Sequence, residues 1–513
     1  MKRKMNKSRL LLIPILCLII VLAGCKASSV EITSIEQLND SRFIVGACLG
    51  ESAVVKIQNL LPNAKLQEFN DIFAGYMSVA EGKISAFAMD RRQMEIAIEG
   101  GLSGVRLLDG LLGDSTEIAI GISPKSSIPD LKGKIDAFLK KITEDGTLAD
   151  MDRRWVQEKN DDMPEIAAPT NPTMHLVVGT SGVVPPYSYY KGSELVGYDI
   201  EMAYRLAEDL NASIEIKVYN YAGLLTAAQA GTIDCILANL NKTPERAEVI
   251  LFSDPILQMS TGVMVRDGSG AVKGSNGFFS SIADSFDKTF VKEGRYKLFL
   301  SGIGMTLAIS DMSIIFGTAL GFVVYLLCRR GNRITNGITR LSIWLIQGMP
   351  LVVLLMVLFY IVFAKVPIDG MWVAIVCFTL TFGASMFGML RSGVSAVDRS
   401  QTEAAYALGF KDSRTFFEVV LPQAVLHFLP EYKSQVVALI KATSIVGYIA
   451  ISDLTKVADI VRSRTFDAFF PLFAIAVIYF VLAGLITFLI GRLLKRMDPH
   501  KRPRDHILKE VGK

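Results

Sequence analysis

Long apolar runs in the C-terminal half of the chain constrain its fold more than any other feature. Four runs approach or exceed the roughly 20 apolar residues that a helix needs to cross a bilayer, at 298–328, 341–364, 371–390 and 468–490. A weaker fifth run, 436–451, carries Lys441. Backbone polar groups must be satisfied within lipid, so these runs predict helices. Five spans would place the two ends of this half on opposite sides of the membrane.

Basic residues indicate which side is cytoplasmic. Arg329, Arg330, Arg333 and Arg340 lie between the first two runs, and a second group follows the last run: Arg492, Lys495, Arg496, Lys501, Arg502 and Arg504. Positive charge collects on the cytoplasmic side, so we expect a cytoplasmic C-terminus and an N-terminal half on the outer face. The net charge of +4 therefore reflects topology and does not indicate nucleic-acid binding.

The N-terminus has the pattern of a secretory signal. Lys2, Arg3 and Lys4 precede an apolar run at 10–22 that is short for a membrane span. Leu22-Ala23-Gly24-Cys25 resembles a bacterial lipobox, which implies a lipoprotein signal peptide over 1–25 and lipidation of Cys25. An uncleaved anchor is the alternative.

The remaining cysteines and the histidines indicate no disulfide framework and no metal site. Cys48 and Cys235 are flanked by strand-like apolar runs, so we expect buried free thiols. Cys328 and Cys377 fall in membrane segments, and the four histidines have no ligand spacing. We expect no metal, and no cofactor bound by this chain.

Residues 30–266 differ in kind, with shorter apolar runs, mixed charges and alternating strand and helix patterns. The predicted fold is multidomain: a two-lobed α/β clamshell followed by an all-α five-helix transmembrane domain. The expected divisions are 1–25 signal, 30–158 lobe two plus the closing segment of lobe one, 159–173 linker, 174–266 lobe one, 267–295 tether, 296–497 membrane domain and 498–513 basic tail.

The loop between the third and fifth apolar runs carries the sequence QTEAAYALG at 401–409 and LPQA at 421–424. Ser400 and Glu403 have capping-box spacing, Gly409 can end the helix, and Pro422 can begin the next. This string resembles the EAA loop of ABC importer permeases of the polar amino acid branch. GMTL at 304–307, QGMPL at 347–351 and KATS at 441–444 extend the resemblance. It implies that Glu403, Ala404, Ala405 and Gly409 couple to an ATPase.

A second resemblance is to the family 3 extracellular solute-binding proteins. Lobe one motifs are VVGT (177–180), PPY (185–187), VGYD (196–199), GTID (231–234), TPER (243–246) and FSDP (252–255). Lobe two motifs come earlier in the chain: SIEQL (34–38), 45–52, GKISAF (82–87) and Asp90. Residues 118–155, with DGTL at 145–148, resemble the closing segment of lobe one.

This order implies a circular permutation, which is tolerated where chain ends lie close together. The chain would begin at lobe two, return to lobe one near residue 116 and complete lobe one over 174–266. A cut at an interlobe crossover would leave fewer hinge strands and a cleft that opens more freely. Two truncated copies that complement each other between protomers are the alternative.

The resemblance also implies the ligand contacts. An amino acid zwitterion taken into a closed cleft needs paired partners for both charges. Arg246 would bind the carboxylate and Asp90 the ammonium, with Asn241 and Ser52 near the carboxylate and Tyr187 as an aromatic wall. Ser181 stands where binders of cationic amino acids have an acid, which favours a neutral polar or acidic ligand.

No G-x-x-x-x-G-K-[ST] phosphate loop occurs in the sequence, so a separate ABC ATPase subunit would bind ATP and Mg. The expected function is therefore the substrate-binding and permease subunit of an amino acid importer. We expect it to be no enzyme itself, to lie among membrane lipids and to form a homodimer. A ligand-gated channel or amino acid sensor that uses the same clamshell is the alternative.

Overall fold

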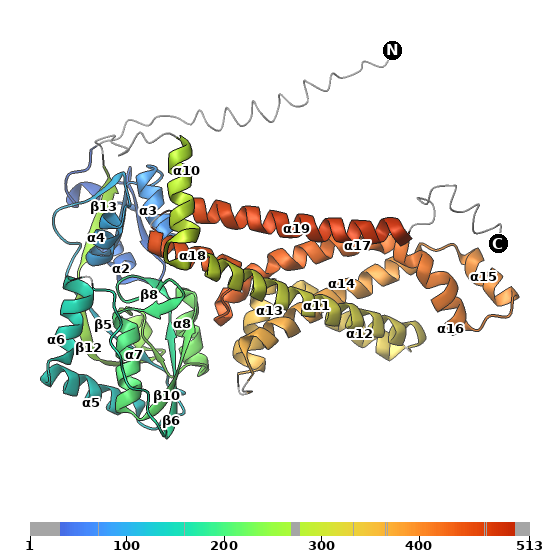
Figure 1. The fold of residues 1–513 in the computed structure, drawn as a ribbon, viewed down its shortest axis with the longest axis horizontal. Helices are drawn as coiled ribbons and strands as arrows, with labels where there is room; N and C mark the ends of the chain where they lie inside the picture. The colour runs from blue at the N-terminus through green and yellow to red at the C-terminus, as the bar shows by residue number, and fades with distance from the viewer. Residues whose placement is uncertain are drawn as a thin grey trace, which may run out of the picture.

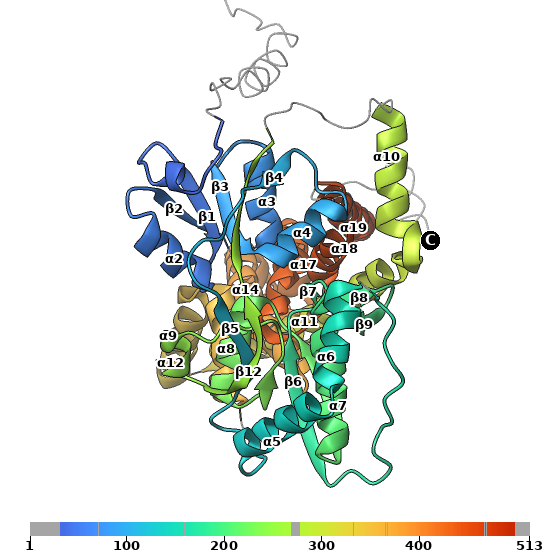
Figure 2. The ribbon, with the colours of Figure 1, turned by 90° about the vertical axis from the view of Figure 1, so that its left-hand side faces the viewer.

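The computed structural model describes residues 31–497 except 70, 159, 268–277, 332, 365, 367, 466 and 468. The predicted signal, Cys25, and the tail 498–513 lie outside the described residues. A two-lobed α/β domain occupies one end of the molecule, and long helices extend away from it (Figure 1). Figure 2 looks onto the α/β end, with one lobe above the other and the helices behind.

Lobe two is a five-stranded sheet in the order β2-β1-β3-β13-β4. Its strands are β1 (Ile44–Cys48), β2 (Lys65–Phe69), β3 (Ala86–Asp90), β4 (Val105–Leu107) and β13 (Thr261–Arg266). The helices of this lobe are η1 (Glu36–Leu38), α2 (Ser52–Leu60), α3 (Ile72–Ala80) and α4 (Arg91–Glu99). Strand β3 is buried along its whole length, as the continuous apolar run of a central strand that is covered on both faces requires.

Lobe one is a five-stranded sheet in the order β10-β6-β11-β5-β12. Its strands are β5 (Thr116–Ile122), β6 (Met174–Thr180), β10 (Ala212–Val218), β11 (Cys235–Ile236) and β12 (Leu251–Met259). A small sheet, β7 (Val183–Val184), β8 (Ser188–Lys191) and β9 (Glu194–Val196), lies beside it. The helices are α5 (Leu131–Glu144), α6 (Thr147–Asp152), η2 (Arg153–Gln157), α7 (Tyr198–Asp209), α8 (Tyr221–Ala230) and α9 (Pro244–Ala247).

The chain crosses between the lobes twice. It passes from β4 to β5, which pairs antiparallel with β11 and β12, as the predicted return near residue 116 requires. It then passes from β12 to β13, which pairs antiparallel with β3 and β4. The prediction that 174–266 completes lobe one is therefore wrong for β13, which belongs to lobe two. Each sheet is complete within one chain, so the fold needs no exchange of lobes between protomers.

The two ends of the clamshell meet beside β4. Arg106 donates from Nη2 to the carbonyl of Ile32 at 2.6 Å, and the Asp267 amide donates to the carbonyl of Gly104 at 2.9 Å. The chain order is thus opened within lobe two, and both interlobe connections remain. The expectation of fewer hinge strands is wrong, because it assumed a cut at an interlobe crossover. The freer cleft was inferred from that cut and stays a prediction without this support.

A buried polar cluster fastens the closing segment 116–158 to lobe one. Glu201 on α7 is fully buried and accepts from Trp155 Nε1 at 2.6 Å, Arg154 Nη2 at 2.7 Å and Arg205 Nε at 2.8 Å. Trp155 itself is 1% exposed. Since a buried carboxylate is tolerated only when it is paired and hydrogen-bonded, these contacts fix η2 against α7.

The helical half contains α11 (Tyr296–Arg330), α12 (Arg333–Gly348), α13 (Leu351–Val357), η5 (Leu358–Val362), α14 (Gly370–Ser395), α17 (Leu421–Ala442), η7 (Thr443–Ile449), α18 (Leu454–Thr465) and α19 (Phe470–Met497). In it α11 packs closely on α14. A Cβ on Gly321 would lie 2.6 Å from the Gly383 carbonyl, so glycine permits this approach.

Two of the five predicted spans are bent. Three helices within the described residues (α11, α14 and α19) are long and apolar enough to cross a membrane, and two bent pairs raise the number to five. Residues 333–348 and 351–362 meet at 108°, and 412–449 and 454–465 at 59°. The predicted second span over 341–364 falls in the first of these bent pairs, where Pro350 separates α12 from α13.

The EAA string forms an ordered elbow, α15 (Arg399–Ala407), α16 (Asp412–Arg414) and η6 (Thr415–Val420), at the end of the molecule farthest from the clamshell (Figure 1). Asp398 accepts from the Ser400 amide at 2.9 Å and caps α15. The predicted Ser400 cap is therefore wrong by two positions. Gly409 has φ of 84°, as a glycine at a helix end does, and Pro422 lies at the start of α17.

Replacement of Glu201 by alanine will destabilise the fold by about 3 kcal/mol, because it leaves the buried Trp155 Nε1 without its acceptor and removes one of the two carboxylates that pair with Arg154. Differential scanning fluorimetry of the full chain measures the change. Glu208→Ala, at an exposed position of the same helix, is the control and will leave the transition within 1 °C of the parent, on the order expected for a surface change. Equal shifts for both variants would contradict this assignment.

Candidate functional site

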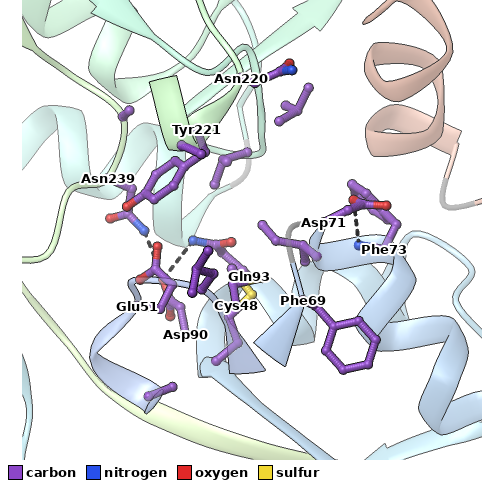
Figure 3. A pocket seen from close by; sticks show the side chains of 18 of the residues that line it. Cys48, Glu51, Phe69, Asp71, Phe73, Asp90, Gln93, Asn220, Tyr221 and Asn239 are labelled. Carbon is purple, nitrogen blue, oxygen red and sulfur yellow. Dashed lines mark hydrogen bonds between the residues drawn. The ribbon is translucent and has the colours of Figure 1, made fainter. Parts of the chain in front are cut away.

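A cavity of about 200 Å³ lies where the two lobes and the helical half meet. Lobe two contributes Glu51, Ser52 and Asp90, lobe one contributes Tyr221 and Asn239, and the helical half contributes Tyr448, Lys456 and Asp459. Figure 3 shows Glu51, Asp90, Asn239 and Tyr221 grouped at one end of it. This volume is below the roughly 300 to 1,000 Å³ of pockets for drug-sized ligands, so the cavity suits a smaller molecule.

Asp90 is the most completely bonded acid of the cavity. It ends β3 and caps α4 by accepting from the Arg92 amide at 2.9 Å. Its Oδ2 accepts from the Tyr187 hydroxyl at 3.4 Å and lies 3.5 Å from Asn239 Nδ2, both from lobe one. Burial raises the pKa of Asp90 to about 6, against the opposing effect of these hydrogen bonds.

Tyr187 and Ser52, two predicted ligand contacts, lie near the boundary between the lobes. Tyr187 is 5% exposed and does not line the cavity. Its hydroxyl donates to Asp90, which does line it. Ser52 begins α2 and lines the cavity, and its Oγ accepts from Thr116 Oγ1 at 3.4 Å. The structure thus brings both into the neighbourhood of Asp90.

Arg246 is 6% exposed and already engaged. Its Nη1 donates to the carbonyl of Asn241 at 2.9 Å, and its Nη2 donates across the lobes to the carbonyl of Gly50 at 2.6 Å. Its guanidinium carbon lies 5.8 Å from the centre of the Tyr221 ring. In this arrangement the guanidinium joins the lobes from behind the cavity wall.

Glu51 is one of the cavity residues that the sequence prediction missed. It precedes Ser52 at the start of α2, and its Oε2 accepts from the Nδ2 of Asn241 in lobe one. Burial raises the pKa of Glu51, and the positive charge of Arg246 acts in the opposite direction. The sequence did carry a signal for Glu51. It is a charged residue within the stretch 45–52 that resembles lobe two, and it directly precedes the predicted contact Ser52.

Two amide oxygens near the cavity have no hydrogen-bond partner among the described residues. They are Oδ1 of Asn239 and Oδ1 of Asn241, and both are buried. A buried acceptor without a donor costs free energy, so these atoms are suited to receive N–H or O–H donors from a ligand.

Helix α18 closes the cavity from the side of the helical half. Lys456 is 4% exposed, and its Nζ donates to the carbonyls of Ser181 at 3.1 Å and Tyr219 at 3.0 Å in lobe one. Arg462 donates to Asp71 of lobe two at 3.0 Å, and Arg464 to Asp161 of the linker at 2.9 Å. One helix therefore contacts both lobes and the linker 159–173.

The described residues provide no group of histidine, cysteine, aspartate and glutamate side chains that could hold a metal ion. Cys48 and Cys235 are both buried, in β1 and β11 of different lobes. The cavity between the lobes is lined by acids and amides together with apolar side chains, and its geometry suits binding of a small molecule that carries polar groups.

Residues 176–415 match the model of the bacterial extracellular solute-binding proteins, family 3. This range begins in β6 of lobe one and extends into the helical half. Among solved structures, a crystal structure of an amino acid ABC transporter with histidines has 27% sequence identity and a TM-score of 0.38, covering 44% of this chain and 100% of that one.

Curated relatives of Bacillus subtilis match over most of their own length. The arginine transport system permease protein ArtQ is 31% identical over 199 residues, covering 38% of this chain and 90% of that protein. The L-cystine transport system permease protein TcyB is 28% identical over 210 residues, covering 40% of this chain and 90% of that protein. The chain therefore belongs to the permeases of amino acid ABC transporters, and it carries a family 3 solute-binding clamshell in the same polypeptide.

Proposed function

We propose that this chain is the substrate-binding and permease subunit of an ATP-driven importer of amino acids. The observation that carries the proposal is the cavity walled by both lobes of the clamshell and by helix α18 of the permease. A ligand held there touches the binding domain and the membrane domain at once. Release from the lobes would therefore place it at the mouth of the permease.

The cavity and the residues directly behind its wall offer partners for both charges of an amino acid. Asp90 would accept from the ammonium, together with the unpartnered amide oxygen of Asn239. Arg246 would bind the carboxylate, with Asn241 and Ser52 beside it, once its contact with the Gly50 carbonyl breaks. Charge-assisted hydrogen bonds of this kind give both affinity and orientation.

A neutral polar side chain fits the cavity better than an acidic one. Glu51, Asp90 and Asp459 line it, whereas Lys456 is occupied by two carbonyls of lobe one. A second carboxylate on the ligand would face these acids without a free cation. We therefore narrow the sequence-based expectation of neutral polar or acidic ligands to neutral polar ones.

The permease half provides the rest of the transport route. A cavity of about 700 Å³ lies among α11, α12, α14 and α17, and polar residues that line it include Arg340, Gln347, Arg391, Glu431 and Gln435. Exposed apolar side chains on α19, such as Phe473, Phe480 and Phe488, suit contact with lipid. Two copies of the chain would enclose the pathway between them.

The elbow that includes Glu403, Ala404, Ala405 and Gly409 would receive the ATPase. Glu403 and Ala404 are exposed on α15, whereas Ala405 is buried and Gly409 ends the turn. ATP and Mg would bind to that separate subunit. The clamshell would lie on the outer face of the bacterial cytoplasmic membrane, anchored through Cys25, with the C-terminus in the cytoplasm.

Amino acid affinity will fall as the pH drops through about 6, because the ammonium needs the ionised form of Asp90. Between pH 7 and pH 5 the Kd will rise about tenfold, as expected when the ionised fraction falls by that factor. Isothermal titration calorimetry of the full chain with the best-binding neutral amino acid measures this. The Asp90→Asn variant will bind weakly at both pH 7 and pH 5. A tenfold rise in Kd between these pH values in that variant would contradict the assignment of Asp90 to the ammonium.

The ion pair between Asp71 of lobe two and Arg462 of α18 will prove necessary for docking. Asp71→Arg or Arg462→Asp will each lower amino acid-stimulated ATP hydrolysis of the reconstituted complex about fivefold or more, because like charges then face each other at a partly buried site. The double exchange will recover part of the loss. Independent, additive losses would mean that the two residues do not act as a pair.

Ala404→Asp will remove the ATPase subunit from the purified complex, because it adds a charge to the exposed face of α15. Co-purification and substrate-stimulated ATP hydrolysis measure the effect, with at least a tenfold loss on the order of a disrupted interface centre. The same substitution at exposed Ala149 in α6 is the control. Undiminished co-purification of Ala404→Asp would place the ATPase elsewhere.

A further inference from the structure

The segment Gly50-Glu51 of lobe two occupies the groups that we assign to the ligand carboxylate. The Glu51 carboxylate accepts from the amide of Asn241, and the Gly50 carbonyl accepts from Arg246 Nη2. Asn241 and Arg246 both belong to lobe one. Two successive residues of lobe two thus satisfy, within the protein, the donors that a bound amino acid would use.

The chemistry of the Glu51 contact matches that of a ligand. A side-chain carboxylate and an α-carboxylate present the same two acceptor oxygens to an amide donor and a guanidinium. Glu51 also lines the cavity beside Asp90 and Asn239 (Figure 3). An incoming carboxylate at Asn241 would therefore meet an existing anion of equal charge in the same place.

Other charged residues that line the cavity are engaged elsewhere. Asp90 is bonded to the Arg92 amide, Tyr187 and Asn239, and Lys456 is bonded to lobe one carbonyls. Asp71 is paired with Arg462. The positive charge of Arg246 acts on Glu51. The amide of Asn241 donates a hydrogen bond directly to the Glu51 carboxylate.

We propose that Glu51 is a specificity-determining residue whose carboxylate competes with ligand carboxylates for the amide of Asn241, beside Arg246. This inference rests on the proposed function, because it requires amino acids to enter the cleft. An amino acid must displace Glu51 before it can bind, and the displaced acid remains in the cavity. Ligands with one carboxylate bear this repulsion once, whereas ligands with a second carboxylate bear it twice.

The test uses Glu51→Gln, which keeps the length and hydrogen-bonding capacity of the side chain and removes its charge. The full chain is purified in lipid nanodiscs at pH 7.5, and binding of L-glutamine and L-glutamate is measured by calorimetry alongside a panel of the common L-amino acids. We expect Glu51→Gln to bind L-glutamine about tenfold more tightly, and L-glutamate by a larger factor, on the scale of a lost charge–charge conflict.

Two further variants separate charge from folding. Glu51→Ala removes both the charge and the hydrogen bond and will show the same direction of change. Glu68→Gln, an exposed position at the end of β2, is matched in chemistry and will leave both affinities unchanged. Melting curves of the ligand-free proteins establish that each variant is folded.

The outcomes distinguish the two levels of the proposal. Weaker amino acid binding in Glu51→Gln would overturn this inference, because it would show Glu51 to be a ligand contact. Equal affinities in the parent and the variant would overturn it as well. Failure of the folded parent and of every folded Glu51 variant to bind any common amino acid would refute the proposed function, on which the inference depends.

Discussion

The buried ammonium of Lys456 is the interaction on which the arrangement of the two halves depends. An amine with 4% exposure needs hydrogen-bond acceptors in place of water, and the carbonyls of Ser181 and Tyr219 accept from two of its N–H groups. Both carbonyls belong to lobe one, so Lys456 fixes that lobe on the permease. Arg462 lies six positions along α18, about 9 Å along the helix axis, and holds lobe two through Asp71. A single short helix therefore sets where both lobes stand, and hence where the cleft opens.

The chain order is compatible with this docking. Because the clamshell is opened within lobe two, its C-terminal strand β13 leads directly toward the tether and α11. The permease is thus attached to the lobe that carries Asp90 and Glu51, while Lys456 contacts the lobe that carries Arg246. Covalent attachment keeps the local concentration of the binding domain high at the permease, so modest contacts on α18 are sufficient for docking.

Much of the fold was predictable because local patterns carried it. The apolar runs located the membrane half, and the motifs around Asp90 and Arg246 located the cleft. Hydropathy reports composition and not direction, so it could not show that Pro350 turns one run through 108°. The resemblance placed residues 261–266 in lobe one, and the sequence could not show that β13 joins the other sheet, since its partners β3 and β4 are distant in sequence.

The missed features have the same cause. The motif that predicted Ser52 contains Glu51, yet only the folded lobes reveal that Glu51 meets Asn241. Residues 454–465 lack a long apolar run, so hydropathy could not indicate a docking helix there. In both places the decisive contact joins residues more than 180 positions apart, as with Glu51 and Asn241 or Lys456 and Tyr219.

The most direct test of the central claim is uptake of a radiolabelled neutral amino acid into proteoliposomes that contain this chain and its ATPase partner. The account predicts accumulation against a gradient that requires ATP and Mg and is lost on Lys456→Ala, with the folded protein retained. Amino acid-evoked ion currents or equilibration without ATP would contradict it and would identify the clamshell as part of a channel or sensor.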